Sequence, residues 1–158
     1  MFESISKILI QYGFFGLFLA SFLSSTVFFP FATELLIPVF LLHLKDIYAV
    51  IFVLSFGSTL GTCVNYAIGF ALSKRTIERY VSKEKILSAG KFMNKYGWSG
   101  LFIVLTLPIP GIPVDVITIL PGLTKMKFEE FFFIVFISKI VRYAIFVGLS
   151  EQLLHLFL

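Results

Sequence analysis

The sequence predicts an all-α polytopic membrane protein built as an inverted repeat of two similar halves. Hydrophobic residues make up 58% of the 158-residue chain and charged residues only 14%, a balance too apolar for a soluble domain of this size. A short motif also occurs twice, because residues 12–18 (YGFFGLF) return 84 residues later as residues 96–102 (YGWSGLF). In membrane proteins, such repeats usually form a binding site where the two halves meet.

The predicted unit of the repeat is an interfacial amphipathic helix, a re-entrant helical hairpin and one spanning helix. Repeat 1 covers residues 2–73 and repeat 2 covers residues 74–150 of a single membrane domain over residues 1–158. Because each half crosses the bilayer once, the second half is expected to be upside down relative to the first.

Repeat 1 begins with a short amphipathic helix. Its apolar residues recur at helical spacing, at Ile5, Ile8, Leu9 and Tyr12. The apolar stretches 13–29 and 31–44 follow, and each is shorter than the ~20 residues that a helix needs to cross a bilayer core. Pro30 and Pro38 interrupt these stretches, so we expect a re-entrant hairpin whose broken backbone faces protein or water.

The spanning helix of repeat 1 is predicted over residues 47–73, which contain no charged side chain. Gly57, Gly61 and Gly69 recur along it at helical spacing and permit close contact with another helix. Asn65 lies on the same stripe, and an amide in mid-membrane needs hydrogen-bond partners.

Repeat 2 has the same order of elements. Residues 74–95 carry seven Lys or Arg against two Glu and are predicted to form a basic interfacial helix. The arms 97–107 and 114–123 are again too short to span, and prolines break the chain between them at Pro108, Pro110 and Pro113. The second spanning helix is predicted over residues 128–149.

The distribution of basic residues predicts the topology. A cytoplasmic excess of Lys and Arg assigns residues 74–95 to the cytoplasm and leaves both termini outside. We expect an integral protein of the cytoplasmic (inner) membrane. The N-terminus lacks the basic region and small-residue cleavage site of a secretory signal.

Four ionisable residues fall at apparent membrane depth: Glu34, Asp115, Lys139 and Arg142. Unpaired, each would cost about 2.5–3.5 kcal/mol at a helix centre, but two carboxylates and two cations in one cavity would balance. In one interpretation they form a structural ion-pair network and Lys139 merely snorkels to the interface. In the other, Arg142 and Lys139 bind an anionic headgroup, Glu34 or Asp115 exchanges a proton, and Asn65 orients one of these carboxylates.

No motif in the chain indicates an enzyme. The sequence has no Gly-x-Ser-x-Gly, no phosphate-binding loop and no paired-histidine metal motif, so we expect no catalytic residues, no metal and no cofactor. The basic segment has few aromatic residues for stacking and is tied to the membrane, so nucleic acid is not an expected partner.

Three motifs occur along the chain in order. Residues 22–26 (FLSST) lead to Pro30 and Glu34, the glycine-rich stretch 57–69 follows, and residues 139–143 (KIVRY) come last. This ordered set resembles the DedA family, also called the VTT or SNARE-associated family, and in particular its short YqaA-like branch. The resemblance covers nearly the whole chain.

The resemblance implies two facing re-entrant hairpins and translocation of a lipid or a polyprenyl phosphate such as undecaprenyl phosphate, coupled in some members to a proton or ion gradient. It makes Glu34 the acidic residue of the first hairpin. Other branches have arginines around the second hairpin's prolines, whereas residues 107–113 here have none. Arg142, with Lys139, would have to replace them.

The leading prediction is therefore a flippase-like protein that moves an anionic lipid carrier, with a proton or monovalent cation as the coupling ion and a homodimer as the expected assembly. Two alternatives are a proton- or cation-coupled transporter of a small solute and a structural membrane-assembly factor. Of the three hypotheses, only the flippase-like protein predicts lipid movement. Only the assembly factor predicts that paired neutralisation of the charges preserves function.

Overall fold

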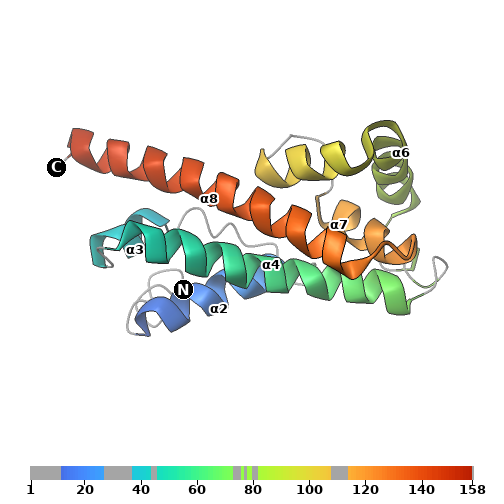
Figure 1. Cartoon of the computed structure of the whole chain (residues 1–158), viewed down its shortest axis with the longest axis horizontal. Helices are drawn as coiled ribbons and strands as arrows, with labels where there is room; N and C mark the ends of the chain where they lie inside the picture. The colour runs from blue at the N-terminus through green and yellow to red at the C-terminus, as the bar shows by residue number, and fades with distance from the viewer. Residues whose placement is uncertain are drawn as a thin grey trace. The chain divides into compact units, whose positions relative to one another are not determined.

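The structure is a computed structural model that describes residues 12–26, 37–43, 46–72, 76, 78–79, 82–107 and 114–157. Its main elements are six α-helices, shown in chain order in Figure 1. They are α2 (Gly13–Ser24), α3 (Ile37–His43), α4 (Ile47–Ala71), α6 (Lys83–Thr106), α7 (Val114–Leu123) and α8 (Phe128–Phe157). The described residues contain no strand, which confirms the all-α prediction.

Two of these helices are long and apolar enough to cross a bilayer. They are α4, over all 25 of its residues, and the 23-residue stretch Phe128–Ser150 of α8. At a rise of 1.5 Å per residue, each exceeds the ~30 Å thickness of the hydrocarbon core. Among the described residues, these two candidate spans coincide in position with the two spanning helices predicted from the sequence.

The chain divides into two compact units, and the division does not follow the two predicted repeats. One unit combines Met1–Gly61 with Lys139–Leu158, and the other is Thr62–Ser138. Both α4 and α8 therefore contribute residues to each unit. The inverted repeat and the re-entrant course of the hairpins stay predictions.

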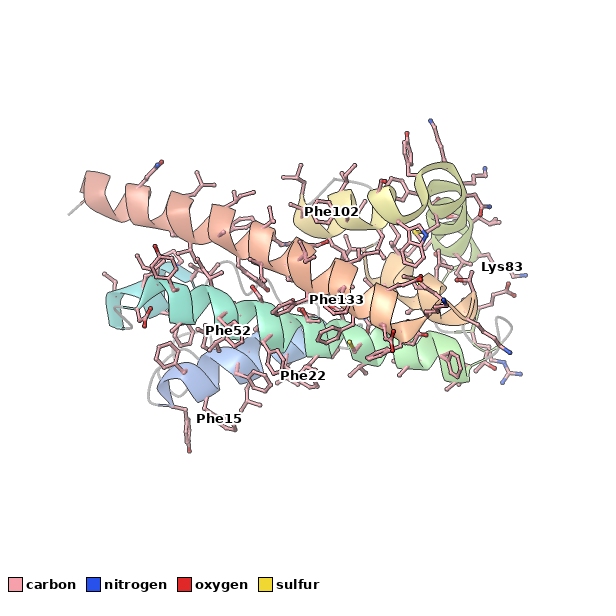
Figure 2. The ribbon with its side chains drawn as sticks, in the orientation of Figure 1. Phe15, Phe22, Phe52, Lys83, Phe102 and Phe133 are labelled. Atoms are coloured by element: carbon pink, nitrogen blue, oxygen red, sulfur yellow. The ribbon has the colours of Figure 1, made fainter. Side chains whose placement is uncertain are left out.

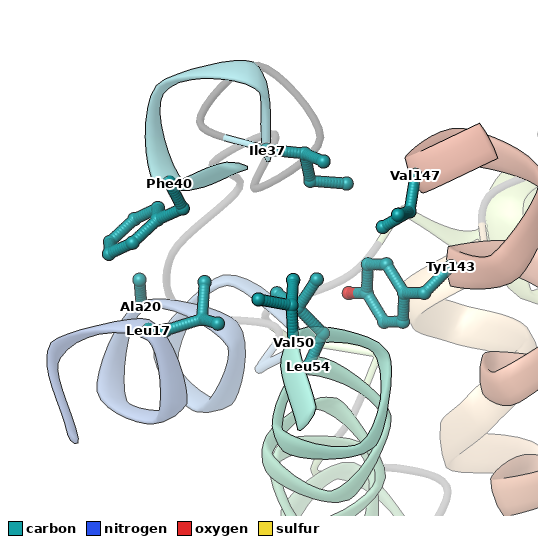
Figure 3. Packing of buried hydrophobic residues seen from close by; sticks show 8 residues of the cluster. All are labelled: Leu17, Ala20, Ile37, Phe40, Val50, Leu54, Tyr143 and Val147. Carbon is teal, nitrogen blue, oxygen red and sulfur yellow. The ribbon is translucent and has the colours of Figure 1, made fainter. Parts of the chain in front are cut away.

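The first unit has a core to which four helices contribute. Figure 3 shows its buried side chains meeting between α2, α3, α4 and α8. They are Leu17 and Ala20 of α2, Ile37 and Phe40 of α3, Val50 and Leu54 of α4, and Tyr143 and Val147 of α8. This packing holds the two short helices against residues of the two long ones.

The second unit contains an aromatic cluster around Tyr66 of α4. The Tyr66 ring stacks on Phe131 with ring centroids 4.8 Å apart and meets Phe128 edge-on at 5.6 Å. Its hydroxyl donates a hydrogen bond to the carbonyl oxygen of Met126, which precedes α8. The contact fixes the start of α8 against α4 within this unit.

Removing the Tyr66 hydroxyl should weaken this unit. We expect Tyr66→Phe to lower the free energy of unfolding by about 1–2 kcal/mol, because the part-buried carbonyl of Met126 loses its donor while the ring packing stays. Thermal unfolding in detergent, followed by circular dichroism, measures the change. The control is Tyr48→Phe, since Tyr48 is 86% exposed and its hydroxyl should contribute little. Equal shifts for the two variants would contradict this assignment.

The first predicted hairpin corresponds to α2 and α3, which contact each other. The predicted N-terminal helix, Pro30 and the turn around it lie outside the described residues. Pro38, which was predicted to interrupt residues 31–44, is the second residue of α3; residues 31–36 lie outside the described residues, so the interruption stays a prediction. A proline is tolerated in the first turn of a helix because the amide there needs no intrahelical partner.

The basic segment and the first arm of the second hairpin lie in α6, which joins two helical stretches across a kink at Gly97, as the two predicted elements require. α6 begins at Lys83 with Ser82 as an extended N-cap, so it contains only the later part of the predicted basic helix 74–95. At Gly97 the backbone takes φ 53° and ψ −133°, and α6 changes direction, as Figure 1 shows. The predicted boundary between the two elements therefore coincides with the kink at Gly97.

The glycines in the two copies of the Tyr-Gly motif share a positive φ. Gly13 has φ 55° and Gly97 has φ 53°, in the left-handed region that favours glycine. A side chain at either position would meet no neighbouring atom within 4 Å, so backbone conformation rather than space requires the glycine. The repeated motif thus marks the start of α2 and the kink of α6 by the same geometry.

The second arm of the hairpin, α7, has the predicted bounds and ends in a defined cap. Pro108, Pro110 and Pro113 lie outside the described residues, and Pro121 lies inside α7. The amide of Met126 donates to the Pro121 carbonyl and that of Lys125 to the Gly122 carbonyl, both at 3.0 Å. These two bonds form a Schellman motif, in which Lys125 takes the left-handed φ of 53°.

Three glycines of α4 lie against the backbone of a neighbouring helix. A Cβ added at Gly57 would lie 2.8 Å from the carbonyl oxygen of Phe18. At Gly61 it would overlap the carbonyl of Phe22, and at Gly69 it would overlap that of Ile119. The first two contacts lie in the first unit and the third in the second unit, so the glycine stripe of α4 serves both α2 and α7.

Many aromatic side chains point outward from the helices. Figure 2 shows Phe15, Phe52 and Phe133, which are 61%, 58% and 63% exposed. Large exposed apolar side chains in such numbers would be unfavourable in water but suit contact with lipid. The exposed faces thus agree with the spanning assignment of α4 and α8.

Candidate polar site on the spanning helices

The two cations of α8 lie at the middle of its spanning stretch. Lys139 is eleven residues from either end of Phe128–Ser150 and is only 7% exposed. Arg142 follows three residues later, on the same face, and is half-buried with its guanidinium 5.8 Å from the ring centre of Phe146. Two basic side chains thus lie within one helical turn at the middle of this apolar stretch.

The position of Lys139 argues against snorkelling. Eleven residues of helix correspond to about 16 Å, well beyond the reach of the four-carbon stem of a lysine. The side chain is also covered by protein. Lys139 is therefore a buried lysine, and an ionisable side chain in the middle of a spanning stretch marks either an ion pair or a ligand site.

Asn65 has a defined partner on another helix. It is 1% exposed, and its Nδ2 donates a hydrogen bond of 3.0 Å to Oγ1 of Thr118 in α7. Thr118 was not singled out in the sequence, although it lies three residues after Asp115 and therefore on the same helix face. The amide predicted to orient a carboxylate is thus bonded to the face that bears Asp115.

The two predicted carboxylates are only partly described. Glu34 lies outside the described residues. Asp115 is the second residue of α7, and its side chain is not described. Asp115 and Asn65 belong to the second unit, whereas Lys139 and Arg142 belong to the first. The predicted network of four charges therefore stays a prediction.

A group of hydroxyls lies at the end of α2 and includes Ser25 of the FLSST motif, to which the sequence analysis gave no site role. Ser21 donates through Oγ to the Leu54 carbonyl at 2.5 Å, and the hydroxyls of Ser25 and Ser58 are hydrogen-bonded at 2.5 Å. The sequence signal was present, since residues 24–26 (SST) are polar within an apolar stretch. This group makes the C-terminal end of α2 and the facing part of α4 polar.

Buried polar atoms of the described residues are satisfied. None of their buried side-chain nitrogen or oxygen atoms lacks a hydrogen-bond partner. Hydroxyls inside the helices bond back to the preceding turn: Ser55 to Ile51, Thr59 to Ser55 and Ser138 to Ile134. Among the same residues, no group of three His, Cys, Asp or Glu side chains could hold a metal ion.

These features define a helical membrane protein with two spanning helices and polar groups at mid-membrane depth. The chain belongs to the VTT domain family, which it matches over residues 29–152. This confirms the resemblance to the DedA family, whose members are in general transporter-like membrane proteins rather than enzymes.

One relative extends this comparison. The chain is 29% identical over 141 residues to an uncharacterized protein of Methanocaldococcus jannaschii, a match that covers 89% of this chain and 86% of that protein. The similarity therefore extends over nearly all of both proteins. No solved structure matches the chain.

Proposed function

We propose that the protein translocates an anionic lipid carrier across the cytoplasmic membrane, and that this carrier is a polyprenyl phosphate such as undecaprenyl phosphate. The observation that carries the proposal is the buried Lys139 at the midpoint of a spanning helix, with Arg142 one turn further on. The family supports transport in general, and the cations suggest the charge of what is transported.

The two cations would bind the phosphate at the membrane depth where the free-energy cost of its desolvation is greatest. A phosphate crossing the ~30 Å core meets its greatest desolvation cost near the midplane. There, the planar guanidinium group of Arg142 would donate two hydrogen bonds, and Lys139 would add a second positive charge. The prenyl tail would stay in lipid throughout, so the protein need enclose only the headgroup.

Glu34 and Asp115 would act as gating groups. In the unloaded protein they would neutralise the cations, and the incoming phosphate would displace them. A carboxylate in a poorly hydrated site binds a proton more readily, so such displacement would couple transport to proton uptake. The hydrogen bond from Asn65 to Thr118 would hold α7 in the register that presents Asp115.

The experiment is translocation of a fluorescent short-chain polyprenyl phosphate in proteoliposomes. Wild type should move the lipid, and Arg142→Ala should reduce the rate about tenfold or more, because the phosphate loses a bidentate charge-assisted partner. Lys85→Ala is the matched control, since Lys85 is an exposed cation of α6. Lipid movement that is the same in wild type and Arg142→Ala would contradict this role for Arg142.

A further inference from the structure

A second candidate site lies in the second unit. A pocket of about 730 Å³ opens between the end of α4, the amphipathic part of α6 and the end of α7. It lies near the end of a spanning helix, because Gly69, Phe70 and Ala71 line it and are the last three residues of α4. This places the pocket at the depth of the lipid headgroups.

The pocket combines positive charge with apolar surface. Lys91 and Lys125 line it together with the polar Asn94, and no carboxylate lines it among the described residues. The apolar lining includes Leu87 and Phe70, which are more than half exposed. A ligand that fits both surfaces has an anionic head and an apolar body.

The backbone conformation of Lys125 also indicates that a cation is required in the lining of this pocket. Lys125 occupies the left-handed position of the Schellman cap, with φ 53°, where glycine is the favoured residue. A lysine there is strained relative to glycine. The cap bonds hold its backbone at the pocket, so the strained residue also supplies a cation to the lining.

We propose that this pocket binds one anionic phospholipid of the surrounding leaflet, with its phosphate at Lys91 and Lys125 and its chain over Leu87 and Phe70. The basic segment predicts the cytoplasmic leaflet, where anionic lipid is drawn to clustered Lys and Arg. The inference goes beyond the proposed function, because it uses none of the mid-membrane residues and requires no transport.

The test measures lipid retention by native mass spectrometry of the detergent-solubilised full chain. The probes are dioleoylphosphatidylglycerol and, as the zwitterionic lipid with the same chains, dioleoylphosphatidylcholine. We expect wild type to retain the anionic lipid about tenfold better. The double variant Lys91→Ala with Lys125→Gly should lose that preference. Its matched control, Lys83→Ala with Lys85→Ala, removes two exposed cations of α6 that do not line the pocket and should keep it.

The substitution Lys125→Gly separates binding from folding. It removes a cation but relieves the left-handed strain, so thermal stability should hold or rise while lipid retention falls. A second substitution fills the pocket without changing any charged residue. A Cβ added at Gly90 meets nothing within 4 Å, so Gly90→Phe should block the lipid and Gly90→Ala should not.

Several results would overturn the proposal. Equal retention by the pocket and control double variants would mean that only diffuse surface charge attracts the lipid. Full competition by glycerol 3-phosphate at equal concentration would identify a soluble phosphate ligand instead. Unchanged retention in Gly90→Phe would exclude the pocket as the binding site. None of these outcomes depends on whether the protein moves a polyprenyl phosphate.

Discussion

Gly61→Ala is expected to prevent correct packing of α2 on α4. The carbonyl oxygen of Phe22 lies where the new Cβ would be, and the Cβ of Ser25 is close by. Because the obstacle is backbone, no side-chain rotation relieves it and the helices must separate. We expect a loss of about 1–3 kcal/mol, toward the upper end of that range. Thermal unfolding in detergent, with size-exclusion chromatography to detect aggregation, measures it.

Gly148→Ala is the matched control for this effect. Gly148 also lies in a spanning helix, but a Cβ there meets nothing within 4 Å. The substitution should leave stability unchanged or raise it by up to about 1 kcal/mol, because alanine has the higher helix propensity. If Gly61→Ala were as stable as Gly148→Ala, the close approach of α2 and α4 would be wrong.

Lys139→Met is expected to slow transport of the anionic lipid strongly. The substitution keeps an unbranched side chain of similar length and removes only the buried charge. Losing one charge-assisted contact to phosphate should lower the rate by about 10–100-fold. The proteoliposome assay measures the rate, with Lys127→Met as control because Lys127 is an exposed cation that precedes α8.

A paired neutralisation distinguishes ligand binding from a structural ion pair. If Glu34 pairs with Arg142 only to dock the hairpin, Arg142→Gln alone should destabilise the protein, and Glu34→Gln with Arg142→Gln should restore both stability and function. The transport account predicts a different result. In that account the double variant folds but moves no lipid. Restored lipid movement in the double variant would favour the structural interpretation.

The sequence predicted the long helices well because their signal is local. An uninterrupted apolar stretch longer than the bilayer core has few alternatives to a spanning helix, and both were found where predicted. The repeated Tyr-Gly motif was also informative about the backbone, since Gly13 and Gly97 both have a positive, left-handed φ.

Two local signals have a clear physical basis in the structure. The backbone at Gly97 is non-helical, so the predicted boundary there is a kink between the two helical stretches of α6. Pro38 lies in the first turn of α3, where a proline costs no intrahelical hydrogen bond, and its role in breaking residues 31–44 stays a prediction.

Parts of the site could not be predicted because they depend on tertiary contacts. The Asn65–Thr118 hydrogen bond joins residues 53 positions apart, and no periodicity along one helix predicts it. The need for an Asn65 partner was evident from a mid-membrane amide, but the identity of that partner was not. The burial of Lys139 likewise required the packing around α8 to be seen.

The most direct test of the central claim compares two lipids with the same tail in proteoliposomes of the wild-type protein. One is a fluorescent short-chain polyprenyl phosphate and the other is the uncharged polyprenol. If the cations of α8 bind the headgroup, the protein should accelerate movement of the phosphate and leave the polyprenol at the rate of protein-free liposomes. Acceleration of both lipids alike, or of neither, would contradict the account.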